Sequence, residues 1–318
     1  MDSHKVVVVI PCFKVKKFVL DVIGGIGSDV DKIIVVDDCC PEGTGTWVRE
    51  NCTDKRVEIV RHDRNQGVGG AVMTGYEKAL TFGADVVVKL DGDGQMDPAL
   101  IPKLVAPILN GEADYSKGNR FFNLESVQEM PAIRLFGNGV LSFLTKISSG
   151  YWSVFDPTNG FTAIHAKLIN LLPKDRIDSR YFFESDMLFR LNLLRAVVAD
   201  VPMDAHYGEE ESNLRVSRVI LPFAWGNFRN LFKRTIYSYF LRDFSLASLE
   251  LVCGGWLVFS GGTFGLFKWW ESSHTGLSVT SGTVMLSALP VLVGVQLLLS
   301  FINFDMTNVP RTPINKRL

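Results

Sequence analysis

Two carboxylates stand one residue apart, directly after a short apolar run in this 318-residue chain. The run is Val86–Leu90, and Asp91 and Asp93 follow it with a glycine after each. Two carboxylates this close repel each other, and a divalent cation such as Mg²⁺ or Mn²⁺ relieves the repulsion and can also hold a diphosphate. Gln95 adds a third oxygen ligand without charge. The motif therefore predicts a metal and diphosphate site, although a polar turn has the same composition.

Three earlier apolar runs have the length and β-branching of buried strands, and helical segments separate them. The runs are Lys5–Ile10, Lys32–Val36 and Val57–Val60. Strand–helix alternation of this kind predicts an α/β fold with a mostly parallel sheet and helices on both faces. Ligands of such sheets bind beyond the carboxyl ends of the strands, which is where Asp91 falls.

Further along the chain the alternation loosens. We expect strands near 115–120, 162–164 and 197–201, and helices over 98–109, 133–147 and 181–194. Asp97 is the expected N-cap of the first of these helices, with Pro98 at its first position. A turn-rich loop at 155–161 precedes the strand at 162–164, and a polar loop at 206–217 is expected to close over the site.

Asp37 and Asp38 end the second predicted strand, on the same sheet edge as Asp91. A carboxylate there can accept hydrogen bonds from a ribose or a base N–H, or it can cap the following turn. The residue types leave both interpretations open. A dinucleotide-binding loop at Gly67, by contrast, is disfavoured, because the last glycine of G-x-G-x-x-G is replaced by Val72 and the loop follows the third strand.

Two acidic residues on the predicted helix 181–194 cannot serve one site. Glu184 and Asp186 are about 200° apart on a regular helix, so one of them faces solvent or pairs with Arg180 or Arg190. Arginine side chains are candidate phosphate ligands because their forked donors match phosphate oxygens. The candidates for an acceptor phosphate are Arg120, Arg134 and Arg215.

Two long apolar runs near the C-terminal end predict a membrane hairpin. Residues 245–267 and 277–302 each exceed the roughly 20 residues that a transmembrane helix needs. Two buried core helices are the alternative, but they would need a very large soluble core. Glu250, inside the first run, is expected to face a partner or to lie near the membrane interface. Basic residues flank both runs on their outer sides, which predicts that both ends are cytosolic.

The chain therefore divides into four predicted parts. Residues 1–218 form a cytosolic catalytic domain, 219–244 an amphipathic interfacial helix, 245–304 two transmembrane helices, and 305–318 a cytosolic tail. The net charge of −1 gives no sign of nucleic-acid binding. The five cysteines show no C-x-x-C pair and indicate reduced thiols.

The ordered motifs resemble those of a known family. The set is Val6–Pro11, Val35–Asp38, Asn65–Ala71 and Asp91–Pro98, joined by Asp156–Phe161 and Phe183–Asp186. It is similar to family 2 glycosyltransferases of the GT-A fold, and more narrowly to the polyprenyl-phosphate glycosyltransferases. These include dolichol-phosphate mannose synthases and the bacterial GtrB-type enzymes, which the two C-terminal spans favour. The resemblance covers the whole chain.

The resemblance implies an activity: inverting, metal-dependent transfer of one sugar, with glucose expected, from a UDP-sugar to a polyprenyl phosphate at the cytoplasmic membrane. It also implies a homo-oligomer. Residues implied to bind the nucleotide-sugar are Pro11, Asp37, Asp38, Gly67 and Asp91. Asp91, Asp93 and Gln95 would hold Mg²⁺ or Mn²⁺. Asp156 and Asp93 would be catalytic, and because a phosphate dianion needs little base catalysis, we expect Asp156 to orient rather than to abstract a proton.

Three alternatives remain open at this point. The donor could be GDP-mannose, the acceptor could be a soluble or peptide molecule, or the chain could be a non-catalytic nucleotide-sugar-binding scaffold. The complete Asp91, Asp93 and Gln95 set argues against the scaffold, since a protein without turnover need not keep metal ligands.

Overall fold

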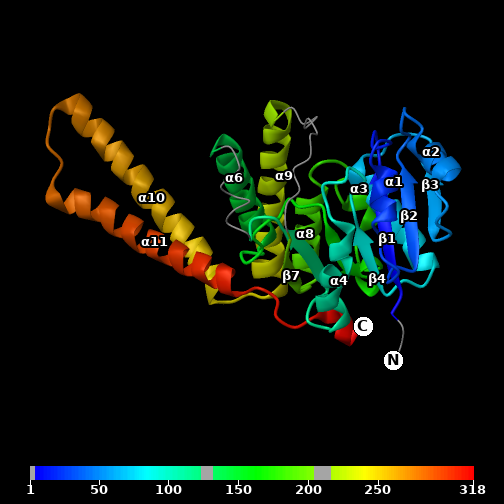
Figure 1. Cartoon of the computed structure of the whole chain (residues 1–318). Helices are drawn as coiled ribbons and strands as arrows, with labels where there is room; N and C mark the ends of the chain where they lie inside the picture. Colours follow the sequence, from blue (N-terminus) through cyan, green and yellow to red (C-terminus); the bar gives the residue numbers. More distant parts are fainter. Residues whose placement is uncertain (1–3, 123–131, 204–215) are drawn as a thin grey trace. The chain divides into compact units, whose positions relative to one another are not determined.

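The computed structural model describes residues 4–122, 132–203 and 216–318 (Figure 1). The chain divides into two compact units. The first unit comprises residues 1–232 and 310–318, and the second comprises residues 233–309. Residues 310–318, which follow the two apolar runs, therefore belong to the same unit as the strands.

The first unit is built on a seven-stranded sheet with the order β3-β2-β1-β4-β6-β5-β7. The strands are β1 (Val6–Cys12), β2 (Lys32–Asp37), β3 (Val57–Arg61), β4 (Val86–Lys89), β5 (Tyr115–Asn119), β6 (Thr162–His165) and β7 (Val198–Pro202). The sheet is mostly parallel, as predicted. β6 is the exception, because it runs antiparallel to both β4 and β5. The start of β6 therefore lies beside the carboxyl end of β4.

Helices cover both faces of this sheet. The helices of the first unit are α1 (Val19–Gly24), α2 (Thr44–Asn51), α3 (Val68–Thr81), α4 (Ile101–Leu109), α6 (Ala132–Ser149), α7 (Ala166–Ile169), α8 (Phe183–Leu193) and most of α9 (Val216–Ile236). On one face, Val8 and Val88 pack in a core with α1 and α4. On the other face, Gly75 of α3 lies so close to Val9 that a Cβ atom there would overlap its side chain. Alternate residues of the strands thus bury against opposite helix layers.

A 3₁₀ turn at Pro98–Leu100 leads into α4. The Asp97 side chain accepts a hydrogen bond from the Ala99 N–H at 2.9 Å, which confirms it as the cap of this segment.

The second unit is a helical hairpin of α10 (Leu246–Thr275) and α11 (Ser281–Thr307). Both helices are long and apolar enough to cross a membrane, and few of their residues are buried. Gly254 and Gly294 bring the two backbones together, since a Cβ on Gly254 would lie 2.9 Å from the Gly294 carbonyl oxygen. Glu250 accepts a hydrogen bond from Ser300 at 2.7 Å, so the predicted partner of this acid exists.

A buried ion pair closes the base of the hairpin. Arg234, in the last turn of α9, donates two hydrogen bonds to the Asp305 carboxylate, at 2.6 and 3.0 Å. The Tyr239 hydroxyl, on a π-helical turn at Tyr237–Arg242, donates to the same carboxylate. All three side chains are buried. They tie the segment that enters the hairpin to the segment that leaves it.

The tail after α11 is fastened to the first unit by one carboxylate. Asp114 is fully buried just before β5, and it accepts hydrogen bonds from the backbone N–H groups of Ile314 at 2.9 Å and Asn315 at 2.8 Å. A third N–H, that of Val197, donates to it at 2.8 Å. The Asn315 side chain also donates to the Ala113 carbonyl at 3.0 Å. Of the predicted tail at 305–318, residues 310–318 are therefore part of the first unit, whereas α11 extends to Thr307 and residues 305–309 belong to the second unit.

Asp114→Asn is expected to loosen this tail. The amide puts an NH₂ group where backbone N–H groups need an acceptor, and an unsatisfied buried donor costs about 1–3 kcal/mol. The purified variant should melt several degrees lower, and limited proteolysis should cut near residue 310 more quickly than in the wild type. Asp175→Asn, on an exposed turn, is the control. Equal cleavage rates in all three proteins would contradict this role.

Candidate active site

The carboxyl ends of β1, β2 and β4 meet at one edge of the sheet, as predicted. Cys12 pairs with Asp37 in the register of β1 and β2, and Val9 pairs with Lys89 in that of β1 and β4. Pro11 is buried near the end of β1. This edge brings together the residues implied to bind a nucleotide-sugar.

Asp37 is almost fully buried, and both of its carboxylate oxygens are engaged. One oxygen accepts from the Cys40 N–H at 2.7 Å and the other from the Gly45 N–H at 2.9 Å. These bonds fix the turn that leads into α2. The contacts match the turn-capping interpretation, and the contact of Asp37 with a ribose or base stays a prediction.

Asp38 fastens the glycine-rich loop that precedes α3. Its carboxylate accepts from the N–H groups of Gln66 and Gly67, both at 2.8 Å, and it contacts His62 Nδ1 at 2.8 Å. Gly67 has φ +86° and lies against the Ser179 carbonyl, where a Cβ atom would overlap. At Gly67 the loop therefore presents only its backbone. His62 was missed by sequence reasoning, because an isolated histidine at the end of an edge strand carries no motif.

Asp91 is bonded to a buried lysine that was also missed. Lys89 is 1% exposed, and its ammonium group lies 2.8 Å from Asp91 Oδ1, 3.1 Å from Glu184 Oε1 and 3.1 Å from the Gly160 carbonyl oxygen. Burial alone would lower the pKa of Lys89, but the carboxylates of Asp91 and Glu184 outweigh it and raise that pKa above its ordinary value. The lysine is therefore charged and joins three segments. In the sequence, the sign of such a buried lysine is a cationic residue inside an apolar predicted strand.

The side-chain oxygen atoms of residues 91–95 suit a hard divalent cation. Asp91 and Asp93 offer carboxylate oxygens at the end of β4, and both side chains are partly exposed. Asp93 Oδ1 accepts from the Gln95 N–H at 3.0 Å, which folds the 91–95 turn back on itself. Among the described residues no group of three His, Cys, Asp or Glu side chains could hold a metal. Asp91, Asp93 and Gln95 therefore fit Mg²⁺ or Mn²⁺ only if diphosphate or water oxygens complete the coordination shell.

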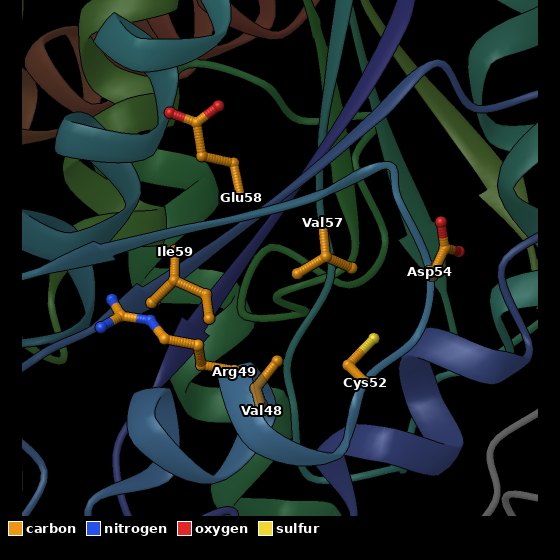
Figure 2. A pocket seen from close by; sticks show the side chains of 7 residues that line it. All are labelled: Val48, Arg49, Cys52, Asp54, Val57, Glu58 and Ile59. Atoms are coloured by element: carbon orange, nitrogen blue, oxygen red, sulfur yellow. The ribbon is translucent and has the colours of Figure 1, made fainter.

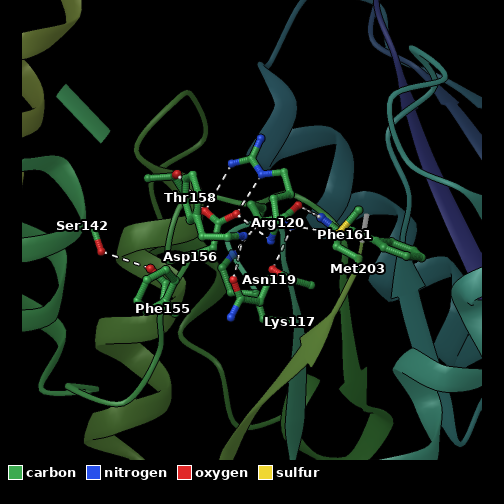
Figure 3. A network of polar contacts seen from close by, with 12 residues as sticks. Lys117, Asn119, Arg120, Ser142, Phe155, Asp156, Thr158, Phe161 and Met203 are labelled. Atoms are coloured by element: carbon green, nitrogen blue, oxygen red, sulfur yellow. Dashed lines mark hydrogen bonds and ion pairs between the residues drawn. The ribbon is translucent and has the colours of Figure 1, made fainter. Parts of the chain in front are cut away.

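Asp156 is completely buried and forms a two-point ion pair with Arg120 (Figure 3). Arg120 Nε lies 2.7 Å from Asp156 Oδ2, and its terminal nitrogen lies 3.2 Å from Oδ1. Thr158 Oγ1 adds a bond to Oδ1 at 3.3 Å. The structure thus brings together two residues that were predicted separately, one as catalytic and one as an acceptor-phosphate ligand. With both oxygens on a guanidinium, Asp156 is suited to orienting rather than to taking a proton.

Polar side chains surround this ion pair. Asp200 Oδ2 accepts from the Asn119 side chain at 3.2 Å and from the Phe155 N–H at 2.8 Å. Lys117 is fully buried and donates to the Asn159 carbonyl. Burial lowers the pKa of Lys117 to about 8, and the attraction of Glu184 and Asp156 offsets only part of that effect.

This depressed pKa predicts a pH dependence that depends on Lys117. Between pH 8 and the ordinary value of 10.5 the unfolded chain binds more protons at this site than the folded chain, so folding gains stability as pH rises. The charges that face Lys117 are Glu184, Asp156, Lys89 and Arg120. The melting temperature of the wild type relative to that of Lys117→Met should therefore increase between pH 8 and pH 9.5. A difference that stays flat or falls over this range would contradict the shift.

Glu184 and Asp186 point to different places, as the helical spacing predicted. Glu184 contacts Lys89, whereas Asp186 is buried and accepts from Asn230 Nδ2 at 2.9 Å. Asp186 also lies 3.4 Å from the Arg190 side chain, so the predicted pairing with Arg190 is confirmed. Glu184 thereby joins the Asp91 side of the site.

Two of the predicted phosphate ligands are not placed. Arg134 lies in the first turn of α6, but its side chain is not described. Arg215, with most of the polar loop at 206–217, lies outside the described residues. Their contact with an acceptor phosphate stays a prediction.

A pocket of about 280 Å³ lies away from this site, between α2 and the edge strand β3 (Figure 2). It is lined by Val48, Arg49, Cys52, Asp54, Val57, Glu58 and Ile59. None of the predicted site residues lines it. The candidate site is therefore the carboxyl edge of the sheet and not this pocket.

The mostly parallel sheet with acidic residues at this edge is a GT-A-like α/β fold. Residues 7–172, just over half of the chain, match the family model described as Glycosyl transferase family 2. The chain therefore belongs to the family 2 glycosyltransferases.

Its relatives include transferases that act on lipid phosphates. The chain is 30% identical to a UDP-N-acetylglucosamine–dolichyl-phosphate N-acetylglucosaminyltransferase of Methanococcus voltae, over 70% of this chain and 94% of that protein. It is 31% identical to an undecaprenyl-phosphate mannosyltransferase of Micrococcus luteus, over 54% of this chain and 70% of that protein.

The solved structure of glucosyl-3-phosphoglycerate synthase from Mycobacterium tuberculosis, in complex with Mn²⁺, UDP and glucosyl-3-phosphoglycerate, has a TM-score of 0.53. It shares 20% identity with this chain, and the match covers 73% of this chain and 80% of that one. This likeness shows a shared fold.

Proposed function

We propose that this protein transfers one sugar from a UDP-sugar to a polyprenyl phosphate at the cytoplasmic face of a membrane, with inversion at the anomeric carbon. Glucose is the sugar that we propose. The observation that supports this most is the Lys89 junction. It bonds Asp91, on the donor side, and the Gly160 carbonyl, in the loop that carries Asp156, through one ammonium group. Groups suited to the diphosphate and to the acceptor thus lie within one bonded network.

The chemistry asks little of the protein beyond positioning. Asp91, Asp93 and Gln95 would hold Mg²⁺ or Mn²⁺, which neutralises charge on a departing diphosphate. A lipid phosphate has a second pKa near 6, like other phosphate monoesters, so its oxygen attacks without a strong base. Asp156, held by Arg120, orients the groups on the acceptor side. Asp38 and the Gly67 loop shape the nucleotide side.

The relatives support the choice of substrates. The Methanococcus protein is named for a UDP-sugar and a dolichyl phosphate, and the Micrococcus protein for an undecaprenyl phosphate. The structural neighbour was solved with UDP and Mn²⁺. The sugars of these relatives differ, so donors of N-acetylglucosamine and mannose have to be compared with donors of glucose.

Membrane placement follows from the hairpin and its two ends. Residues 233–309 leave the first unit and return to it, since residues 310–318 belong to that unit and bind Asp114. Two crossings by α10 and α11 bring both ends to one side, and the flanking basic residues favour the cytosolic side. The lipid acceptor would then present its phosphate on the side of the catalytic unit. We also propose that the protein forms a homo-oligomer.

The test is nucleotide release from a panel of UDP- and GDP-sugars by the purified protein, with undecaprenyl phosphate and Mg²⁺ or Mn²⁺. Release from one UDP-sugar that requires the lipid phosphate is the expected result and names the sugar. Release from GDP-mannose alone would contradict the proposal that the donor is a UDP-sugar. Release that is independent of the lipid would overturn the acceptor, and no release from any donor would favour a binding scaffold.

A further inference from the structure

Two fully buried lysines hold consecutive carbonyl groups of one loop. Lys117 donates to the Asn159 carbonyl and Lys89 to the Gly160 carbonyl, the latter at 3.1 Å. The two lysines are 0% and 1% exposed. Burying an ammonium group is costly unless it is paired, so two of them at adjacent carbonyls mark a constrained part of the chain.

The sheet explains how two strands reach one loop. Lys89 in β4 and Lys117 in β5 are both register partners of Thr162, the first residue of β6, which lies between them. Residues in one row across a sheet project from the same face, so both lysines reach the segment that enters β6. This segment, residues 156–161, carries Asp156. Figure 3 shows Lys117, Asp156 and Phe161 within the same network.

The loop is shaped to receive these lysines. A Cβ atom on Gly160 would lie 2.5 Å from Lys89 Nζ and would overlap Asp91 Oδ2. Asn159 turns its side chain inward and bonds the Gly118 carbonyl at 2.8 Å, while its own Oδ1 accepts from the Phe161 N–H at 3.0 Å. The loop therefore lies tightly against β4 and β5 at its last three residues.

We propose that Lys89 and Lys117 are positioning residues that clamp the 156–161 loop and so set the distance between Asp156 and the donor-side carboxylates. Neither lysine is required to touch a reacting atom. Lys117 acts on the loop alone, whereas Lys89 also bonds Asp91 and Glu184. The two lysines should therefore differ in their effect on the donor side. The part of the inference that concerns catalysis rests on the proposed function.

The first test is hydrogen exchange of the loop in the full-length protein without substrate. Lys117→Met keeps the length of the side chain and removes the donor. Because a hydrogen bond from a charged group is lost, amides at 159–161 should exchange roughly 10- to 100-fold faster, with β1 and β2 unchanged. Lys103→Met is the matched control, since Lys103 donates to a backbone carbonyl at the surface, that of Pro202 at 2.9 Å. Unchanged exchange in the loop of Lys117→Met would overturn the clamp.

The second test separates the two lysines. UDP affinity in the presence of Mn²⁺ should stay within about twofold of the wild type in Lys117→Met and fall in Lys89→Met, because Lys89 alone bonds Asp91. If transfer is observed, Lys117→Met should lower kcat and raise KM for the lipid phosphate. Equal losses of UDP affinity in both variants would overturn the division of roles.

A third variant covers the case in which a lysine variant does not fold. Gly160→Ala keeps both lysines and pushes the loop away from Lys89 and Asp91. It should show the same local increase in exchange, and normal exchange would overturn the clamp. Hydrogen exchange needs no substrate, so the two ideas can fail separately. If only the clamp is wrong, the wild type transfers sugar and exchange in the loop is unchanged in the variants. If only the proposed transfer is wrong, the wild type is inactive and exchange in the loop is still faster in the variants.

Discussion

Asp93→Asn is expected to lower the rate of sugar transfer by roughly 10²- to 10³-fold or more, because in the proposed function Asp93 is a charged ligand of the metal that would neutralise the leaving diphosphate. Asp93 is the better test than Asp91. Asp91 is also bonded to Lys89, so its replacement would leave a buried ammonium with one carboxylate fewer. Asp93 Oδ1 accepts from the Gln95 N–H within the same turn, a bond that an asparagine side chain can keep.

The measurement is the rate of nucleotide release as a function of Mg²⁺ or Mn²⁺ concentration, with Mn²⁺ binding followed by electron paramagnetic resonance. Asp93→Asn should bind Mn²⁺ more weakly in the presence of UDP. Asp97→Asn is the control in the same segment, because Asp97 caps the turn at Ala99. Wild-type turnover and metal dependence in Asp93→Asn would rule out the proposed metal motif.

Arg120→Met is expected to destabilise the catalytic unit strongly. Asp156 is completely buried, and removing the partner of a buried charge costs about 3–5 kcal/mol. Combining it with Asp156→Asn should recover part of that loss, because the uncompensated carboxylate is then gone. Melting of the four proteins of this double-mutant cycle measures the coupling. Arg49→Met, at an exposed position of α2, is the control, and additive effects in the cycle would contradict the pairing.

The same variants test how Asp156 acts. If it orients, Asp156→Asn should slow transfer and leave the shape of the pH–rate profile unchanged. Complete loss of turnover with unchanged donor and acceptor binding, together with loss of an acidic limb present in the wild type, would identify it as a general base instead.

The strands and the edge that carries the site were predictable because they depend on local patterns. Continuous apolar runs predicted β1, β2 and β4. Because Asp38 and Asp91 follow two of these runs, their place at the carboxyl edge of the sheet could also be predicted. The direction of β6 was not predictable, since four residues carry no sign of parallel or antiparallel pairing. Yet that direction brings the Asp156 loop beside β4.

The hydrogen-bond and ion-pair partners of the charged residues could not be predicted from the sequence either. Lys89 and Lys117 stand among strand residues, and nothing local tells that each is buried against a loop some forty to seventy positions further on. The residue type of Arg120 suggested that it binds a phosphate, whereas in the structure it forms an ion pair with Asp156. Long-range pairing of this kind depends on sheet order, which local spacing does not encode.

The docking of residues 314 and 315 on Asp114 has a consequence for the order in which the protein matures. During synthesis Asp114 emerges from the ribosome about 200 residues before these donors do. Until α11 has emerged, the buried carboxylate lacks two of its three backbone partners. The first unit can therefore reach its final stability only after the hairpin of α10 and α11 has been made, which couples the completion of the fold to the synthesis of the two helices that are long and apolar enough to cross a membrane.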